Sequence, residues 1–147
     1  MLALAFALPS RATAAALPLT VAMTSDSALT LDSNSPASSG PHAMYVSFRI
    51  ANTSGAQVAN LQATISGFGS GTVLSGGQAA MQYVGTLAAG ASRTVYWFIT
   101  YPSSFNVRNV LTVSVADGAG GTASGSGAVR TMSMISAQAG GAHQHQQ

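Results

Sequence analysis

The sequence predicts an all-β domain with the architecture of an immunoglobulin-like antiparallel β-sandwich of about seven strands. The first observation is a segment, residues 44–65, in which apolar and polar side chains alternate with a period of two on both sides of a turn. The second is that similar apolar segments recur along the chain with glycine-rich turns between them. The third is that no segment has the periodicity of an amphipathic helix. Together these patterns favour two layered sheets.

The expected strands follow the alternation, and the expected turns follow the breaker residues between them. Asn52-Thr53-Ser54-Gly55 has the composition of a tight turn. Pro102 ends the most apolar segment, because proline cannot donate a hydrogen bond to a neighbouring strand. Gly125 and Gly127 predict a bulge in the last strand. In chain order the predicted strands are a split first strand at 17–24 and 28–32, then 44–51, 61–65, a short edge strand near 73–74, 79–87, 92–101, 107–116 and 122–135.

The interior is expected to form from the apolar side of each alternating segment. Trp97 anchors it, since a buried aromatic side chain removes about 150–250 Å² from water. The predicted core residues are Val46, Phe48, Ile50, Leu61, Ile65, Leu87, Trp97, Ile99, Leu111 and Val113.

Charged residues are sparse, and this excludes several classes of function. The 147 residues are 47% hydrophobic and 5% charged, with five arginines, three aspartates and no cysteine. Such an apolar fraction supports an ordered core. The scattered arginines do not form the basic cluster that nucleic-acid binding requires, so no nucleic-acid partner is expected. The absence of cysteine excludes thiol catalysis and cysteine-ligated metals.

The two ends of the chain differ in composition from the segments between them. Residues 1–14 hold a short apolar run and then Ala12-Thr13-Ala14, the small-x-small pattern of a signal-peptide cleavage site, although the usual positively charged start is missing. A hydrophobic first strand is the alternative interpretation. We expect a signal peptide, its start truncated, at 1–14, a mature domain at 15–135 and a disordered polar tail at 136–147. No later stretch is long enough for a membrane helix, so we expect a secreted or cell-surface protein whose mature chain has no membrane span.

The titratable side chains do not form a recognisable catalytic or metal site. The acids lie in or beside turns, where aspartate commonly bonds the backbone. His143 and His145 could hold a transition metal on an extended chain, but ordering the tail would cost about 1–2 kcal/mol per residue. We therefore predict no enzymatic activity, no metal and no cofactor. The acids and histidines considered are Asp26, Asp32, Asp117, His42, His143 and His145.

Two motifs resemble a known group of bacterial surface modules. The strand and turn Tyr-Val-Ser-Phe-Arg-Ile-Ala-Asn-Thr-Ser-Gly, which begins at Tyr45, and the later Gly-Thr-Leu-Ala-Ala-Gly-Ala-Ser, which begins at Gly85, resemble the DUF11 and CARDB-type immunoglobulin-like repeats. The resemblance covers roughly residues 28–117, although the acidic D-x-x-P element common in DUF11 repeats is absent. It implies a structural module of the bacterial cell surface, with no catalytic residues to carry over. Asn52-Thr53-Ser54 also matches a glycosylation acceptor, which has little weight in a chain that resembles bacterial proteins.

Aromatic residues on the outside of the sandwich have two open interpretations. With Trp97 directed inward, Tyr96 and Phe98 point outward from the same strand, and Tyr45 is expected nearby. They are either covered by a neighbouring domain or loop, or they form a contact patch for a protein or glycan.

Functional hypotheses from three classes follow. The first is a non-enzymatic exported module that serves as a spacer or adhesion unit, with neighbouring immunoglobulin-like domains or a surface protein or glycan as partners. An odd number of strands favours it, because the two ends of the domain then lie at opposite poles. The alternative is a carbohydrate- or protein-binding module that uses Tyr45, Tyr96 and Phe98. A small hydrolase is the third and is disfavoured by the few titratable residues.

Overall fold

Ten β-strands are present in the residues that the structure describes. The computed structural model describes residues 15–25, 27–31, 42–69, 71–102 and 107–133, and within these ranges no helix is long and apolar enough to cross a membrane. Seven of the strands have five or more residues, in agreement with the predicted number. The strands are β1 (Ala15–Ala16), β2 (Leu19–Met23), β3 (Ala28–Leu31), β4 (His42–Asn52), β5 (Val58–Ser66), β6 (Val73–Leu74), β7 (Met81–Leu87), β8 (Ser92–Tyr101), β9 (Arg108–Ala116) and β10 (Gly121–Ser133).

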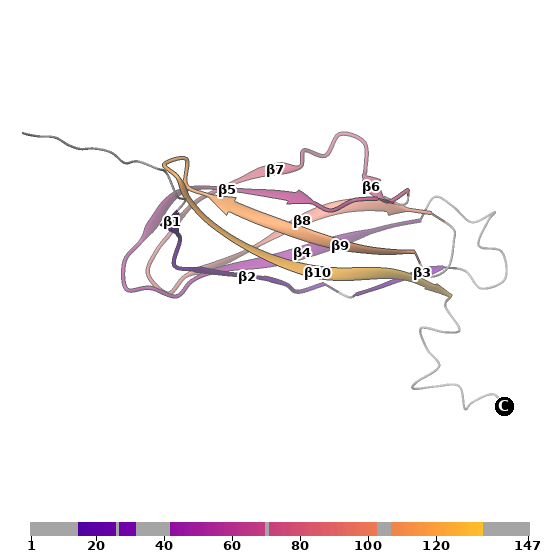
Figure 1. Cartoon of the computed structure of the whole chain (residues 1–147), viewed down its shortest axis with the longest axis horizontal. Helices are drawn as coiled ribbons and strands as arrows, with labels where there is room; N and C mark the ends of the chain where they lie inside the picture. Colours follow the sequence, from indigo (N-terminus) through magenta and orange to yellow (C-terminus); the bar gives the residue numbers. More distant parts are fainter. Residues whose placement is uncertain (1–14, 26, 32–41, 70, 103–106, 134–147) are drawn as a thin grey trace, which may run out of the picture.

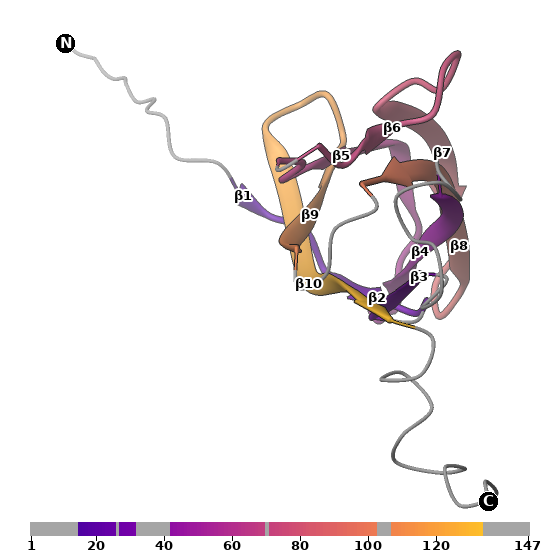
Figure 2. The ribbon, with the colours of Figure 1, turned by 90° about the vertical axis from the view of Figure 1, so that its right-hand side faces the viewer.

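The strands form two sheets that face each other across the interior (Figures 1 and 2). The first, which we call the β10 sheet, has the order β1-β10-β9-β5-β7, and β3 also pairs with β10. The second, the β4 sheet, has the order β2-β4-β8-β6. All neighbouring strands are antiparallel except β1 and β3, which run parallel to β10. This arrangement confirms the predicted sandwich.

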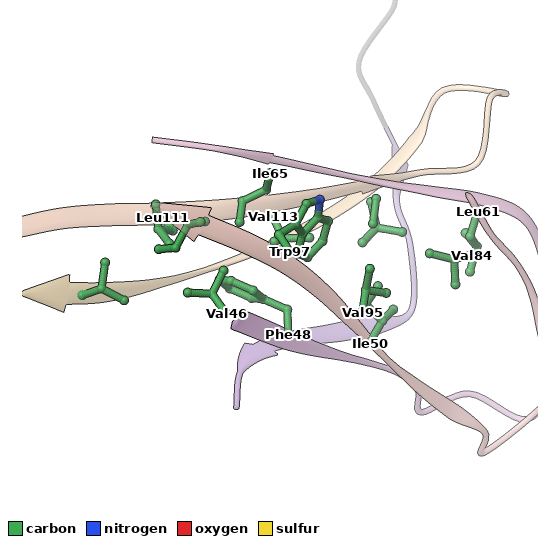
Figure 3. Packing of buried hydrophobic residues seen from close by; sticks show 14 of the residues in the cluster. Val46, Phe48, Ile50, Leu61, Ile65, Val84, Val95, Trp97, Leu111 and Val113 are labelled. Carbon is green, nitrogen blue, oxygen red and sulfur yellow. The ribbon is translucent and has the colours of Figure 1, made fainter. Parts of the chain in front are cut away.

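The core lies between the sheets and is built from the alternating segments (Figure 3). β8 is typical, because Val95, Trp97 and Ile99 are buried while the residues between them are more exposed. Trp97 is fully buried, and its indole Nε1 donates a hydrogen bond to the carbonyl of Ala80 at 3.0 Å. All ten residues expected in the interior lie in this buried cluster, together with Ala63, Val84, Val95, Tyr101, Val115 and Val129.

The N-terminal segment crosses from the β10 sheet to the β4 sheet, a crossing that the predicted split strand does not include. Leu17 donates its amide to the carbonyl of Thr122 in β10, but Leu19 already pairs with Asn52 in β4. Pro18 lies at the crossing, where its missing amide hydrogen would interrupt a continuous ladder. After β2 the chain returns to the β10 sheet as β3. The segment therefore closes one side of the sandwich with three short strands.

The predicted bulge in the last strand is wrong, since β10 pairs with β9 in unbroken register from Thr122 to Arg130. Its glycines have another role. A Cβ atom on Gly125 would lie 1.8 Å from the carbonyl oxygen of Val21 in β2, and one on Gly127 would lie 2.6 Å from the sulfur of Met23. Glycine is thus required where β2 crosses closely over β10.

Candidate functional site on the aromatic face of the β4 sheet

Three aromatic side chains gather on the outer face of the β4 sheet. Tyr45 in β4 lies directly opposite Phe98 in β8, with ring centroids 4.6 Å apart. Tyr45 also meets Tyr96 edge to face, with centroids 6.2 Å apart. Tyr45 is 57% exposed and Tyr96 is 55% exposed, whereas Phe98 is partly buried. We call these three residues the aromatic cluster, and within the described chain its two tyrosines are open to solvent.

On the side of β2 the aromatic cluster adjoins polar side chains, whereas Val73 in β6, which is also exposed, lies toward the other side. Ser47, the ladder partner of Tyr96, is buried, and the chain that follows β2 bonds to it: the Thr24 amide donates to the Ser47 carbonyl at 2.8 Å. The hydroxyl oxygens of Thr24 and Ser47 are 2.9 Å apart, and the Ser47 amide donates to the Ser25 hydroxyl at 3.0 Å. The exposed rings of Tyr45 and Tyr96, each with a phenolic hydroxyl group, suit a ligand that has both apolar and hydroxyl surfaces, such as a sugar.

The edge of β8 beside the aromatic cluster is closed by two glutamine side chains. β6 pairs only with the end of β8. Nearer its middle, the Phe98 amide donates to Gln78 Oε1 at 3.1 Å, and Gln82 Nε2 donates to the Tyr96 carbonyl at 2.7 Å. An unpaired edge would otherwise offer these backbone groups to a strand from another chain. At these two positions the edge of β8 is therefore capped, while the rings of Tyr45 and Tyr96 on the face of the sheet are exposed.

The two motifs that carry the family resemblance are joined by Asn52, which is 1% exposed. Its Nδ2 donates to the carbonyls of Ala56, Leu87 and Ala88 at 2.8, 3.0 and 3.1 Å. Its Oδ1 accepts from the amide and the hydroxyl of Ser54 at 3.1 and 2.7 Å. The asparagine of the first motif thus holds the turn of the second. A side-chain amide that is buried and bonded in this way is not accessible for glycosylation in the folded protein.

Asp117 organises a turn. Its Oδ1 accepts hydrogen bonds from the amides of Ala119 and Gly121, both at 2.8 Å. These two bonds lower the pKa of the Asp117 carboxyl, because they favour its charged form. His42 begins β4, and the structure describes only its backbone position. The remaining candidates lie outside the described residues: Asp26, Asp32, His143 and His145.

The residues that the structure describes contain no group of three or more His, Cys, Asp or Glu side chains that could hold a metal ion. The expected signal peptide at 1–14 and tail at 136–147 also lie outside the described residues.

No protein-family model and no curated protein matches the sequence. Among solved structures, the chain is similar to the CARDB domain of a Pyrococcus furiosus protein, with 9% identity and a TM-score of 0.52 over 80% of this chain and 97% of that one. A PapD-like domain of human CEP192 has 6% identity and a TM-score of 0.44, over 90% of this chain and 96% of that one. A C. elegans member of the MSP family has 8% identity and a TM-score of 0.41, over 80% and 98%. The predicted likeness to CARDB-type domains is thus confirmed for the fold.

Proposed function

We propose that this chain is a non-enzymatic exported module that acts as a spacer or adhesion unit at a bacterial surface. The observation that carries the proposal is where the domain begins and ends along β10. Ala15 pairs with Gly121, the first residue of β10, and Leu31 pairs with Ser133, its last. The 13 residues of this strand extend over about 40 Å. β1 and the end of β10 lie at opposite poles (Figure 1), so such a domain would hold its neighbours a fixed distance apart.

The pairing of the terminal strands also supports a load-bearing role. β1 and β3 run parallel to β10, so opposed forces on residues 15 and 133 act along these strands. The Ala15 amide donates to the Gly120 carbonyl at 3.2 Å, and the Arg130 amide donates to the Ser27 carbonyl at 2.9 Å. Force in this direction loads the hydrogen bonds of each pair together, in shear. A hairpin opened from its end breaks its bonds one after another.

The outer face of the β10 sheet carries rows of hydroxyl side chains, and such rows suit a surface that is exposed to water. Hydroxyl side chains lie in rows across β5, β9 and β10, and the hydroxyl oxygens of Thr112 and Ser126 are 2.8 Å apart. The residues in these rows are Thr64, Ser114 and Ser124 in one, and Ser66, Thr112 and Ser126 in the next. The expected signal peptide and the few titratable residues add support for an exported, non-enzymatic protein.

Force spectroscopy tests the spacer function by changing the direction of load. The chain has no cysteine, so introduced cysteines can serve as attachment points. We expect a severalfold higher unfolding force when the domain is pulled through residues 15 and 133 than when it is pulled through cysteines at Ala43 and Thr100. Those two residues are direct partners in β4 and β8, so force there opens the ladder from one end. Equal forces in the two directions would contradict a load-bearing function.

The exposure of the aromatic cluster favours a second candidate function, binding of a carbohydrate or a protein. Binding of a carbohydrate is tested by substitution of the two tyrosines. The double substitution of Tyr45 and Tyr96 by alanine is expected to weaken binding to a cell-wall polysaccharide by about tenfold or more, because exposed aromatic residues contribute most at such contacts. Tyr83→Ala is the matched control, since Tyr83 is 68% exposed on the other sheet. Calorimetric titration in which the double variant and the control bind equally well would exclude the aromatic cluster as the glycan site.

A further inference from the structure

Two arginines face each other at the end of the β10 sheet opposite to the β9–β10 turn. Arg108 in β9 and Arg130 in β10 are direct partners in the antiparallel ladder, and both are exposed. Residues in this relation have Cβ atoms about 4.5–5.5 Å apart. Their guanidinium groups therefore project from the same small area of the outer face.

This pair places two positive charges together without a described negative partner. Like charges directly opposite each other destabilise a sheet. Asp117 is the one carboxylate side chain within the described ranges, and it lies nine residues from Arg108 along β9 and its turn, or about 30 Å. Neither arginine forms an ion pair in the part of the chain that the structure describes. Two of the five arginines of the chain thus stand at one ladder position, where an anion can contact both.

A small hollow adjoins the two arginines, and its volume limits the size of the group that can bind there. Its volume is about 280 Å³, and it is lined by Ser27, Arg108, Ala128, Val129 and Arg130. Pockets for drug-sized ligands have volumes of about 300–1,000 Å³, so this hollow suits a smaller group. Ser27 adds a hydroxyl that can donate to an oxygen atom.

We propose that Arg108 and Arg130 form a binding site for a sulfate or phosphate oxyanion, which we call the arginine pair site. Guanidinium groups present planar forks of N–H donors that match the oxygen atoms of such anions. A doubly negative group offsets both charges at once and removes the repulsion across the ladder. The oxyanion is either free in solution or esterified to an acidic polysaccharide. The site goes beyond the spacer function, because it uses the guanidinium groups of Arg108 and Arg130, whereas the spacer function uses the backbone pairing of β10 with β1 and β3.

Titration with sodium sulfate at constant ionic strength tests the arginine pair site. We expect saturable NMR shifts at the amides of Arg108, Ala128 and Arg130, and a higher melting temperature than in sodium chloride, because a ligand of the folded state stabilises it. Arg108→Gln and Arg130→Gln should each weaken binding by about tenfold, since each removes charge-assisted hydrogen bonds. Arg49→Gln is the matched control, because Arg49 is exposed on the β4 sheet.

Stability without sulfate separates a binding role from a structural one. Either Arg→Gln change at the pair should raise the melting temperature, because it removes the repulsion. A lower melting temperature, the absence of saturable shifts, or an equal loss in the Arg49→Gln variant would overturn the proposal. So would sulfate binding that appears only after Asp26→Asn, because the pair would then be neutralised within the chain.

The source of the anion is decided by comparing free sulfate with a sulfated oligosaccharide and its unsulfated form. Tighter binding of the sulfated oligosaccharide than of free sulfate assigns the site to a polysaccharide ester. Equal affinity per sulfate assigns it to the free anion. Equal binding of the sulfated and unsulfated oligosaccharides contradicts an oxyanion site.

Discussion

Replacing Gly125 by alanine is expected to destabilise the domain by about 3 kcal/mol or more. The added Cβ would lie 1.8 Å from the backbone oxygen of Val21, a distance that no side-chain rotation relieves. β2 cannot easily move away, because its five residues pair with β4. Either β2 separates from the sandwich or the pairing of β10 is disturbed, and both expose part of the core.

The sign of the change in unfolding free energy identifies its cause. In a strand without close neighbours, alanine is favoured over glycine by roughly 0.5–1 kcal/mol, because glycine loses more backbone entropy on folding. A large loss in the Gly125→Ala variant must therefore come from the contact with β2. Gly55→Ala is the control, since a Cβ there has no atom within 4 Å and its backbone is outside the left-handed region.

Urea unfolding and amide hydrogen exchange measure the effect. The Gly125→Ala variant should have a lower midpoint and faster exchange in residues 19–23, while the Gly55→Ala variant stays within about 0.5 kcal/mol of the parent. If the two variants have the same midpoint, β2 does not depend on the glycine for its place in the sandwich.

The interior could be predicted from the sequence because alternation is a local property. It assigns each residue to a face, and so it placed Phe48 and Trp97 inside, where their rings meet with centroids 6.3 Å apart. The same alternation placed Tyr45, Tyr96 and Phe98 outside. It contains no information on which strand lies beside which, because the pairing partners are distant in the chain.

The N-terminal crossing and the glycines of β10 show this limit. A first strand that pairs with β4 over its whole length has the same local sequence pattern as one that changes from β10 to β4 at Pro18. A glycine inside a strand is consistent with a bulge or with the close approach of another backbone, and only the register distinguishes them. The glycines at 125 and 127 therefore predict a bulge in β10, whereas the observed register shifts are in β5, between Val58 and Leu61 and between Leu61 and Gln62, beside Asn60 with a φ of 60°.

Long-range pairing also explains which parts of the candidate sites the sequence did not reveal. Gln78 and Gln82 close the β8 edge only because β7 and its preceding turn lie beside β8. Arg108 and Arg130 are neighbours only in the observed register of β9 and β10. Neither pair has a recognisable motif, so polar residues at ordinary positions were the only sequence signal.

Replacing Asn52 by alanine is expected to cost about 2–4 kcal/mol of unfolding free energy. The change removes the donor for the carbonyls of Ala56, Leu87 and Ala88. The hydrogen bond to the Leu87 carbonyl is buried, so that oxygen would be left without a partner in the interior. Asn52→Asp should be no better, because a carboxylate keeps the shape but cannot donate to three carbonyl oxygens. Thr53→Ala is the control. Thr53 is exposed in the same turn, and its hydroxyl makes one contact, at 3.5 Å, to the carbonyl of Pro18.

Hydrogen exchange after this substitution tests whether Asn52 couples the two turns. The amide of Asn52 also donates to the Ala91 carbonyl at 2.8 Å, and the Ala91 amide donates to the Ala88 carbonyl at 2.9 Å, so the second turn closes on the asparagine. We therefore expect faster exchange in residues 87–91 as well as in 52–56. Faster exchange confined to 52–56 would mean that the turns are stabilised separately. Loss of protection in both segments would give a physical reason why the Asn-Thr-Ser-Gly turn and the Gly-x-Leu-x-x-Gly turn occur together in one domain, since the side-chain amide of Asn52 holds both.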